Sequence, residues 1–224
     1  MSSIFGRKVL FSNLSYKTTE TKLVDYFSTY GTIEELNLDK DDQAQSLRQG
    51  FLVYKDLQSI DKLMFNRPHS IDNRQIHIQR SINQQHNQNH FEQLANQLTV
   101  YEIFINRLYS NEKRQMFINY FQRFGSIVDC RVIHSYSNSN VRQPGYAFIR
   151  FHDYDTVDRI ILSKPHLIQS KYYHIRKSIP IEYNYILSSI KPLSQHKPIW
   201  QYYSLGLIHM KTHEIIYPTI TNQQ

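Results

Sequence analysis

The octapeptide Pro144-Gly145-Tyr146-Ala147-Phe148-Ile149-Arg150-Phe151 predicts a β-strand with large apolar side chains on both faces. Successive side chains of a strand point to opposite faces, so Tyr146 and Phe148 share one face while Ile149 and Phe151 share the other. An antiparallel sheet commonly packs one face on the core and leaves the other in solvent. An amphipathic strand with buried rings would need only one apolar face. The second apolar face therefore indicates a sheet surface on which a flat ligand can stack.

The chain repeats the surroundings of this strand. Leu10 recurs as Phe104, 94 residues further on, and Phe51 recurs as Phe148, 97 residues further on. An insertion of three residues therefore falls between these two pairs, at a position where a hairpin loop can absorb it. Self-similarity at a fixed period indicates repeated structural units. The chain is predicted to hold two copies of one small domain.

Each copy has the same predicted order of elements, βαββαβ. A helix with apolar residues at helical spacing follows the first strand, and a second helix ends before Pro68 or Pro165. The expected strands are 9–11, 33–38, 51–54 and 75–78, then 103–105, 127–133, 146–151 and 172–175. Gly31 and Gly125 follow the first helices, where left-handed caps are expected. The predicted fold is α+β, with a ferredoxin-like, four-stranded antiparallel sheet backed by two helices in each copy.

Composition divides the chain into four segments. The two domains are predicted at 7–81 and 101–179. The segment 82–100 between them is rich in Asn, Gln and His and is predicted to be a linker. The tail, 180–224, holds four prolines and many large apolar residues, which is too apolar for an ordinary disordered segment. Its role does not follow from the sequence.

The aromatic positions of the predicted open face differ between the two copies. Unpaired bases stack on exposed rings, and their phosphates need nearby cations. The second copy has three rings for this purpose, Phe104, Tyr146 and Phe148. The first copy keeps only Phe51, because Leu10 and Gln49 stand at the other two ring positions. Each lost stack costs roughly 1–3 kcal/mol of binding free energy, so the second copy is expected to bind more strongly.

Charge follows the same asymmetry. The chain has a formal net charge of +7 and a pI of about 9.3, which favours a polyanionic partner. Residues 1–81 hold 11 Lys and Arg against 10 Asp and Glu, whereas residues 101–179 hold 12 against 6. The residues predicted to contact RNA are Phe104, Tyr146, Phe148, Phe51, Arg142, Arg150, Lys171, Arg176, Lys177 and Lys8.

Several stretches resemble a known family. The octapeptide and the segment 103–108 look like the two signature motifs of the RNA recognition motif (RRM). The segments 14–20 and 67–74 resemble the first RRM of the heterogeneous nuclear ribonucleoprotein (hnRNP) A/B family, and 153–158 resembles the second. The resemblance covers about residues 7–179, and the tandem RRMs of Musashi-type proteins are a close second. It departs from the family at Leu10, Gln49, Pro144 and Glu102, and in lacking a glycine-rich tail.

The resemblance implies single-stranded RNA binding in mRNA processing or regulation. It also implies that the protein is located in the nucleus and, in addition, in the cytoplasm. A further implication is that the two domains pack directly against each other. In that packing Arg74 is expected to pair with Asp153 and Asp155. If exposed, such pairs contribute only about 0–1 kcal/mol.

Enzymatic function is not indicated. No catalytic constellation, cofactor motif or metal-ligand spacing is recognisable, and the single cysteine, Cys130, cannot form an internal disulfide. No stretch has the length of a membrane span. Two alternatives stay open: binding of single-stranded DNA, and a protein-interaction scaffold that uses the first domain or the tail.

Overall fold

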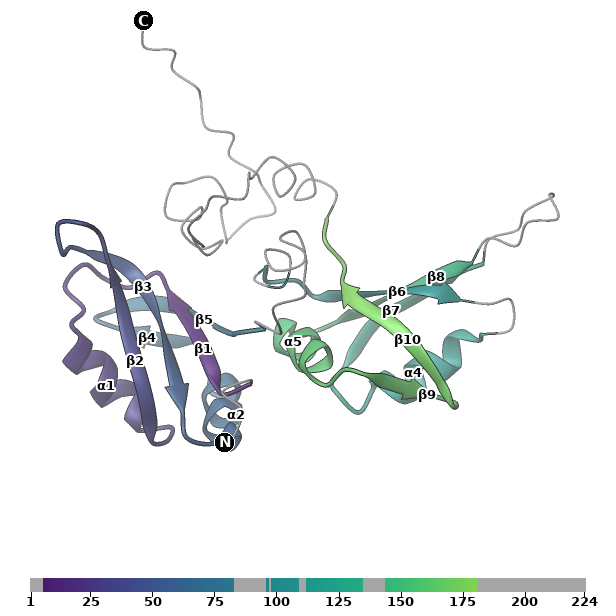
Figure 1. The fold of residues 1–224 in the computed structure, drawn as a ribbon, viewed down its shortest axis with the longest axis horizontal. Coiled ribbons are helices and arrows are strands. Elements are labelled where there is room, and N and C mark those ends of the chain that lie inside the picture. Colours follow the sequence, from purple (N-terminus) through teal and green to yellow (C-terminus); the bar gives the residue numbers. More distant parts are fainter. Residues whose placement is uncertain (1–5, 83–95, 97, 109–111, 135–143, 181–224) are drawn as a thin grey trace, which may run out of the picture. The chain divides into compact units, whose positions relative to one another are not determined.

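The computed structural model describes residues 6–82, 96, 98–108, 112–134 and 144–180 (Figure 1). The predicted linker, 82–100, and the predicted tail, 180–224, therefore lie mostly outside the described residues. Within the described part, no helix is long and apolar enough to cross a membrane, and no cluster of three His, Cys, Asp or Glu side chains could hold a metal ion.

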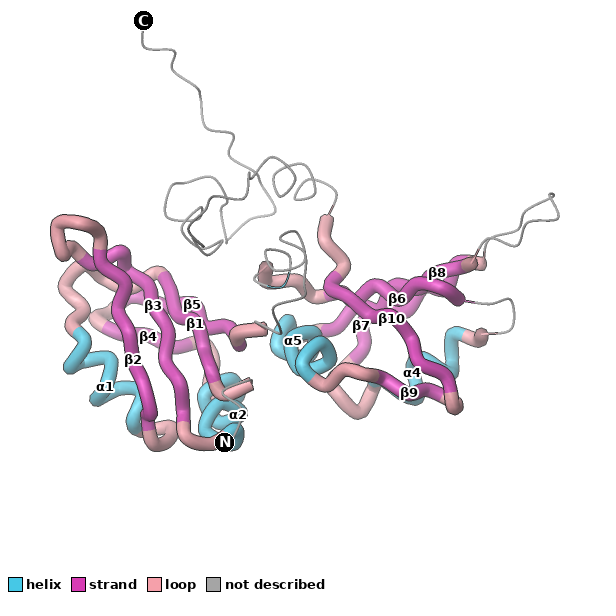
Figure 2. The backbone as a smooth tube through the Cα atoms, in the orientation of Figure 1, coloured by secondary structure: helices cyan, strands magenta, loops and turns pink. Residues whose placement is uncertain are grey.

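The first domain has five strands and two helices. They are β1 (Lys8–Ser12), α1 (Glu20–Ser28), β2 (Ile33–Lys40), β3 (Ser46–Tyr54), α2 (Leu57–Phe65), β4 (His69–Ile71) and β5 (Arg74–Arg80). The strands form one antiparallel sheet in the order β2-β3-β1-β5-β4 (Figure 2). The apolar positions of α1 and α2, Leu23, Phe27, Ile60 and Leu63, pack with Val9 and Phe11 of β1 in the core.

The second domain repeats this arrangement. Its elements are β6 (Glu102–Leu108), α4 (Arg114–Phe121), β7 (Ile127–Ile133), β8 (Gly145–Phe151), α5 (Tyr154–Leu162), β9 (His166–Ile168) and β10 (Lys171–Lys177). The sheet order is β7-β8-β6-β10-β9. The predicted fold class is confirmed, with one difference. Each sheet has a fifth strand of three residues, β4 or β9, which forms a hairpin with the last strand.

The dipeptide Pro-His occurs at 68–69 and again at 165–166, at the start of each of these short strands. The His69 ring donates from Nε2 to the Leu63 carbonyl oxygen at 2.8 Å, and its Nδ1 accepts from the Tyr26 hydroxyl at 2.9 Å. His166 makes the equivalent pair of bonds, 2.7 Å to the Ile160 carbonyl oxygen and 3.0 Å from the Tyr120 hydroxyl. Each ring thus ties the end of a helix to the hairpin beside it. Burial lowers the pKa of both rings, which favours their neutral form.

The two glycines that follow the first helices, Gly31 and Gly125, are required for a different reason from the one expected. Neither Gly31 nor Gly125 has a positive φ, so the predicted left-handed caps are wrong. A Cβ atom on Gly31 would lie 2.5 Å from the Cβ of Ser59, and one on Gly125 would lie 2.4 Å from Oγ1 of Thr156. The glycines are therefore needed where the second helix of each domain approaches the loop after the first.

Candidate nucleic-acid interface

Three aromatic rings gather on the sheet of the second domain. Phe104 of β6 lies directly opposite Phe148 of β8, and their ring centroids are 5.2 Å apart. The Tyr146 ring lies 5.9 Å from that of Phe104 and 5.7 Å from that of Phe148. The intervening residues Ala147 and Ile149 are fully buried, which fixes the rings on the face away from the helices. The strand alternation thus brings together all three predicted rings.

Two guanidinium groups lie over these rings. The Cζ atom of Arg176, from β10, is 4.5 Å from the Phe104 centroid, and that of Arg131, from β7, is 5.1 Å from the Phe148 centroid. Arg131 also donates to Glu102 at 2.8 Å. No cation–ring contact is found for Tyr146 in the described part, and 37% of this side chain is exposed. The ring cluster is therefore bordered by positive charge on both flanking strands, β7 and β10, and Tyr146 is its most accessible ring.

The other predicted cations have mixed positions. Arg150 lies two residues after Phe148, on the same face, and is exposed. Lys171 instead makes an ion pair with Glu112, and its Nζ lies 5.0 Å from the Tyr173 ring centroid. Arg142 lies outside the described residues.

The prediction for Lys177 is wrong. Only 1% of the residue is exposed, and its Nζ lies 2.7 Å from Oδ1 of the equally buried Asp158 on α5. The physical reason is strand alternation, which turns Lys177 toward the helices because Arg176 faces the open side. Burial lowers the pKa of Lys177 and raises that of Asp158, although the attraction within the pair acts in the opposite sense. This pair holds α5 on β10 and cannot contact a nucleic acid.

Two side chains of β10 extend the open face and were not predicted. Tyr172 and His174 alternate with Arg176, and both are exposed, Tyr172 to 68%. His174 pairs across the ladder with Asn106 of β6, whose side chain therefore lies on the same face. The parity of positions 172, 174 and 176 was a signal in the sequence that could have identified them.

The first domain presents a different open face. Phe51 lies opposite Leu10 of β1, and the Nζ atom of Lys8 lies 3.4 Å from the Phe51 ring centroid. Burial lowers the pKa of Lys8, while the carboxylates of Glu35 and Asp39 raise it. Gln49 is 4% exposed. The two predicted contact residues of this domain, Lys8 and Phe51, thus lie against each other.

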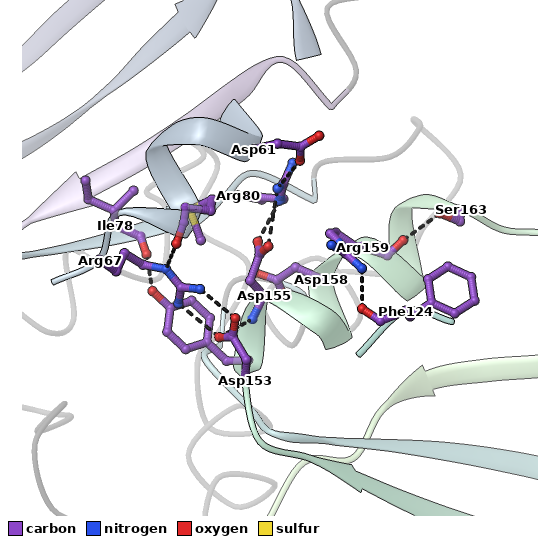
Figure 3. Close-up of polar contacts among 12 residues, drawn as sticks. Asp61, Arg67, Ile78, Arg80, Phe124, Asp153, Asp155, Asp158, Arg159 and Ser163 are labelled. Carbon is purple, nitrogen blue, oxygen red and sulfur yellow. Dashed lines mark hydrogen bonds and ion pairs between the residues drawn. The ribbon is translucent and has the colours of Figure 1, made fainter. Parts of the chain in front are cut away.

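Two ion pairs join the domains, and they involve different arginines from the one predicted (Figure 3). Arg67 donates to both carboxylate oxygens of Asp153, at 3.0 and 2.6 Å. Arg80 donates to both oxygens of Asp155, at 2.6 and 3.2 Å. Arg74, the predicted partner, donates instead to Asn13 within its own domain, at 2.8 and 3.2 Å. The predicted carboxylates take part in the contact, but the predicted cation does not.

Tyr154 lies at the centre of this contact. Its hydroxyl donates to the Ile78 carbonyl oxygen at 2.5 Å, and the Arg67 guanidinium lies 4.5 Å from its ring centroid. The His77 ring lies 5.7 Å from the same ring, and its Nε2 is 3.2 Å from the Thr99 hydroxyl. Burial, together with the charge of Arg67, lowers the pKa of His77 to about 4. The domain contact is thus built from aromatic packing as well as charge.

A comparison with protein families finds one model in both domains. The model, described as RNA recognition motif, matches residues 9–77 and 103–169. The first match runs from β1 into β5, and the second runs from β6 through β9. Both signature segments, with Phe104 and with Tyr146 and Phe148, lie inside the second match.

Solved structures give weaker likenesses. The chain is similar to the RNA binding domain of Hrp1 in complex with RNA, with 24% identity and a TM-score of 0.34, over 79% of this chain and 98% of that one. It is also similar to RNA recognition domains 1 and 2 of Sex-lethal from Drosophila melanogaster, with 13% identity and a TM-score of 0.36, over 77% and 99%. At such identities and TM-scores, neither likeness tells what this chain binds.

Proposed function

The chain belongs to the RNA recognition motif family, and from this premise we propose that it binds single-stranded RNA, chiefly on the open sheet face of its second domain. One observation carries the proposal: Phe104, Tyr146 and Phe148 lie with centroids 5.2–5.9 Å apart on two adjacent strands. Bases splayed from a single strand can stack on such rings.

The cations beside the rings give the binding its second component. Arg131 and Arg176 lie over Phe148 and Phe104 in the free protein. An incoming base takes the ring face, and the displaced guanidinium then binds the adjoining phosphate or stacks on the base. Arg150, exposed on the same face, adds a third positive charge. The first domain contributes less, since Phe51 is its one ring at the three platform positions.

Ring substitutions in the full chain test this proposal. RNAs selected by the chain from a random pool serve as ligands, and fluorescence anisotropy gives their affinities. Replacing Phe104, Tyr146 or Phe148 by Ala should each cost roughly 1–3 kcal/mol of binding free energy. Phe65→Ala is the matched control, because this ring is 88% exposed on α2. Undiminished affinity in the triple variant would exclude the ring cluster as the binding surface.

The same ligands distinguish RNA from DNA. Oligonucleotides of identical sequence with and without 2′-hydroxyl groups should bind with different affinities if the chain recognises ribose. Equal affinities would favour single-stranded DNA as an equivalent partner. By its resemblance to the hnRNP A/B family, the chain is further proposed to act in nuclear mRNA processing or regulation. Fluorescence microscopy of the tagged chain tests that location.

A scaffold function is the second candidate, and one observation favours it. Leu57 and Phe65, at the two ends of α2, are 53% and 88% exposed, so the first domain offers two large apolar side chains to a partner. Exposed apolar surface of this kind is typical of protein contacts. Capture of a protein after RNase treatment, lost in Leu57→Ser and Phe65→Ser variants, would support this function.

A further inference from the structure

The open face of the first domain contains two buried polar atoms without hydrogen-bond partners. Nε2 of Gln49 is a donor, and Oδ2 of Asp39 is an acceptor; neither atom has a partner in the described structure. Buried polar groups are nearly always paired in folded proteins, and an unpaired one costs stability. Both atoms are shielded from solvent in the free protein, so a ligand that displaces the side chains covering them would supply the missing partners.

The strand pairing places these side chains near each other. Asn37 and Leu38 of β2 lie opposite Phe51 and Gly50 of β3, two strands that run side by side (Figure 1). Asp39 lies one step beyond Leu38 and Gln49 one step beyond Gly50, at the point where the ladder becomes irregular. Alternation puts both on the face of Asn37 and Phe51, away from the buried Leu38.

The surroundings of Asp39 orient its carboxylate. Asn37 donates from Nδ2 to Oδ1 of Asp39 at 2.8 Å, which leaves Oδ2 unpaired. Burial raises the pKa of this carboxyl to about 6, although the bond from Asn37 and the charge of Lys8 lower it. A pKa of about 6 leaves most of these carboxyl groups ionised at neutral pH. An ionised carboxylate repels a phosphate, so the part of the RNA that fits beside it is the edge of a base.

Base chemistry selects among the four nucleotides. The Watson–Crick edge of guanine shows an acceptor, O6, beside two donors, N1–H and N2–H. A carboxylate accepts from both donors, while an amide N–H donates to the acceptor. Adenine and cytosine would turn ring-nitrogen lone pairs toward the carboxylate, and uracil offers one donor between two carbonyl oxygens. Guanine alone brings two donors against the carboxylate.

We propose that Gln49 and Asp39 form a hydrogen-bonding subsite for the Watson–Crick edge of guanine, beside the ring of Phe51. The inference rests on the proposed RNA-binding function and gives the first domain a role in choosing the base. Gln49 stands where the second domain has Tyr146. The first domain thus uses edge recognition at the position where the second domain uses stacking.

Base analogues in the selected RNAs test this subsite. With the wild-type chain, one guanine position should lose about tenfold in affinity when changed to adenine, as for a bidentate base contact. Inosine, which lacks the N2 amino group, should be intermediate, and 7-deazaguanine, whose Watson–Crick edge is intact, should bind as guanine does. Asp39→Asn should abolish the preference for guanine over inosine. Gln49→Leu should weaken the preference for guanine over adenine.

Glu35→Gln is the matched control, because it removes the same charge from an exposed residue of the same strand. Its preference for guanine should equal that of the wild type. Thermal unfolding separates binding from folding: Asp39→Asn relieves a buried, partly unpaired carboxylate and should not lower the melting temperature. If the wild-type chain bound no RNA, both the proposed function and the proposed subsite would be refuted. If it bound RNA while Asp39→Asn kept the wild-type base preference, the subsite alone would be refuted.

Discussion

Two consecutive cations of β10 have opposite environments. Arg176 lies exposed over the Phe104 ring, whereas Lys177 is buried against Asp158. The sequence places both in a basic cluster, and composition alone cannot separate them. Strand parity can, once the register is anchored by the buried Ile175 between the exposed His174 and Arg176. A prediction from parity would have excluded Lys177 and included Tyr172.

The two cations should therefore respond differently to substitution. Lys177→Ala leaves the Asp158 carboxylate buried without its ion pair, which typically costs about 3–5 kcal/mol of the free energy of unfolding. Arg176→Ala removes an exposed side chain and should change that free energy by less than about 0.5 kcal/mol, while it weakens RNA binding. Urea denaturation and anisotropy titrations measure the two quantities. Equal stability of the two variants would contradict the assigned burial.

His77 predicts a pH dependence of stability. Its folded pKa of about 4 lies below the ordinary value of 6.5, so the unfolded chain binds more protons between these values. The free energy of unfolding must then fall as pH decreases from 7 to 5. His77→Gln removes this contribution, and the difference between wild type and variant in urea denaturation at both pH values isolates it from the other histidines. A wild type that lost no more stability than the variant would count against the buried, neutral ring.

At the scale of elements, most of the fold follows from the sequence. The helices and the four main strands lie close to where spacing and prolines predicted them, because alternating and helical periods are local signals. The exception is β3, which begins at Ser46 and not at Phe51. The three-residue strands β4 and β9 were missed, since their pairing depends on a hairpin and not on a period. The role of Gly31 and Gly125 was also misassigned. A helix approaching from elsewhere in the sequence leaves no local signal at a glycine.

The approach of α5 to Gly125 can be measured. Gly125→Ala should destabilise the second domain by about 1–3 kcal/mol, because its Cβ would lie 2.4 Å from Oγ1 and 2.9 Å from Cγ2 of Thr156. Thr156→Ala removes both atoms, so the double variant should recover part of the loss. Chemical denaturation of the four proteins completes the cycle. Additive effects of the two substitutions would show that the clash is not the cause.

At the scale of the whole molecule, the least predictable feature is which arginines join the domains. Arg67 precedes the β4–β5 hairpin, Arg74 and Arg80 are the first and last residues of β5, and all three carry the same charge. Only the tertiary structure determines that Arg67 and Arg80 reach Asp153 and Asp155 while Arg74 donates to Asn13. The candidate site was easier to predict from the sequence, because strand alternation alone brings the three rings together.

The two ion pairs should differ in strength. The Arg80–Asp155 pair is only 5% and 7% exposed, whereas the carboxylate of the Arg67–Asp153 pair is 43% exposed. Arg80→Ala should therefore loosen the domain contact more than Arg67→Ala, since a buried charge that loses its partner is costly and an exposed pair contributes little. Fluorescence energy transfer between labels on the two domains reports the change. Arg74→Ala is the control and should leave the transfer efficiency unchanged.

Helix α5 takes part in two ion pairs, one with the first domain and one within its own domain. Within one helical turn, Asp155 pairs with Arg80 of the other domain and Asp158 pairs with Lys177, the neighbour of Arg176. A fragment that begins after the first domain would leave Asp155 without its counter-ion, close to the carboxylate of Asp158. Dissecting the protein into halves would thus alter the half that is kept, and affinities measured on such a fragment would not be those of the intact chain.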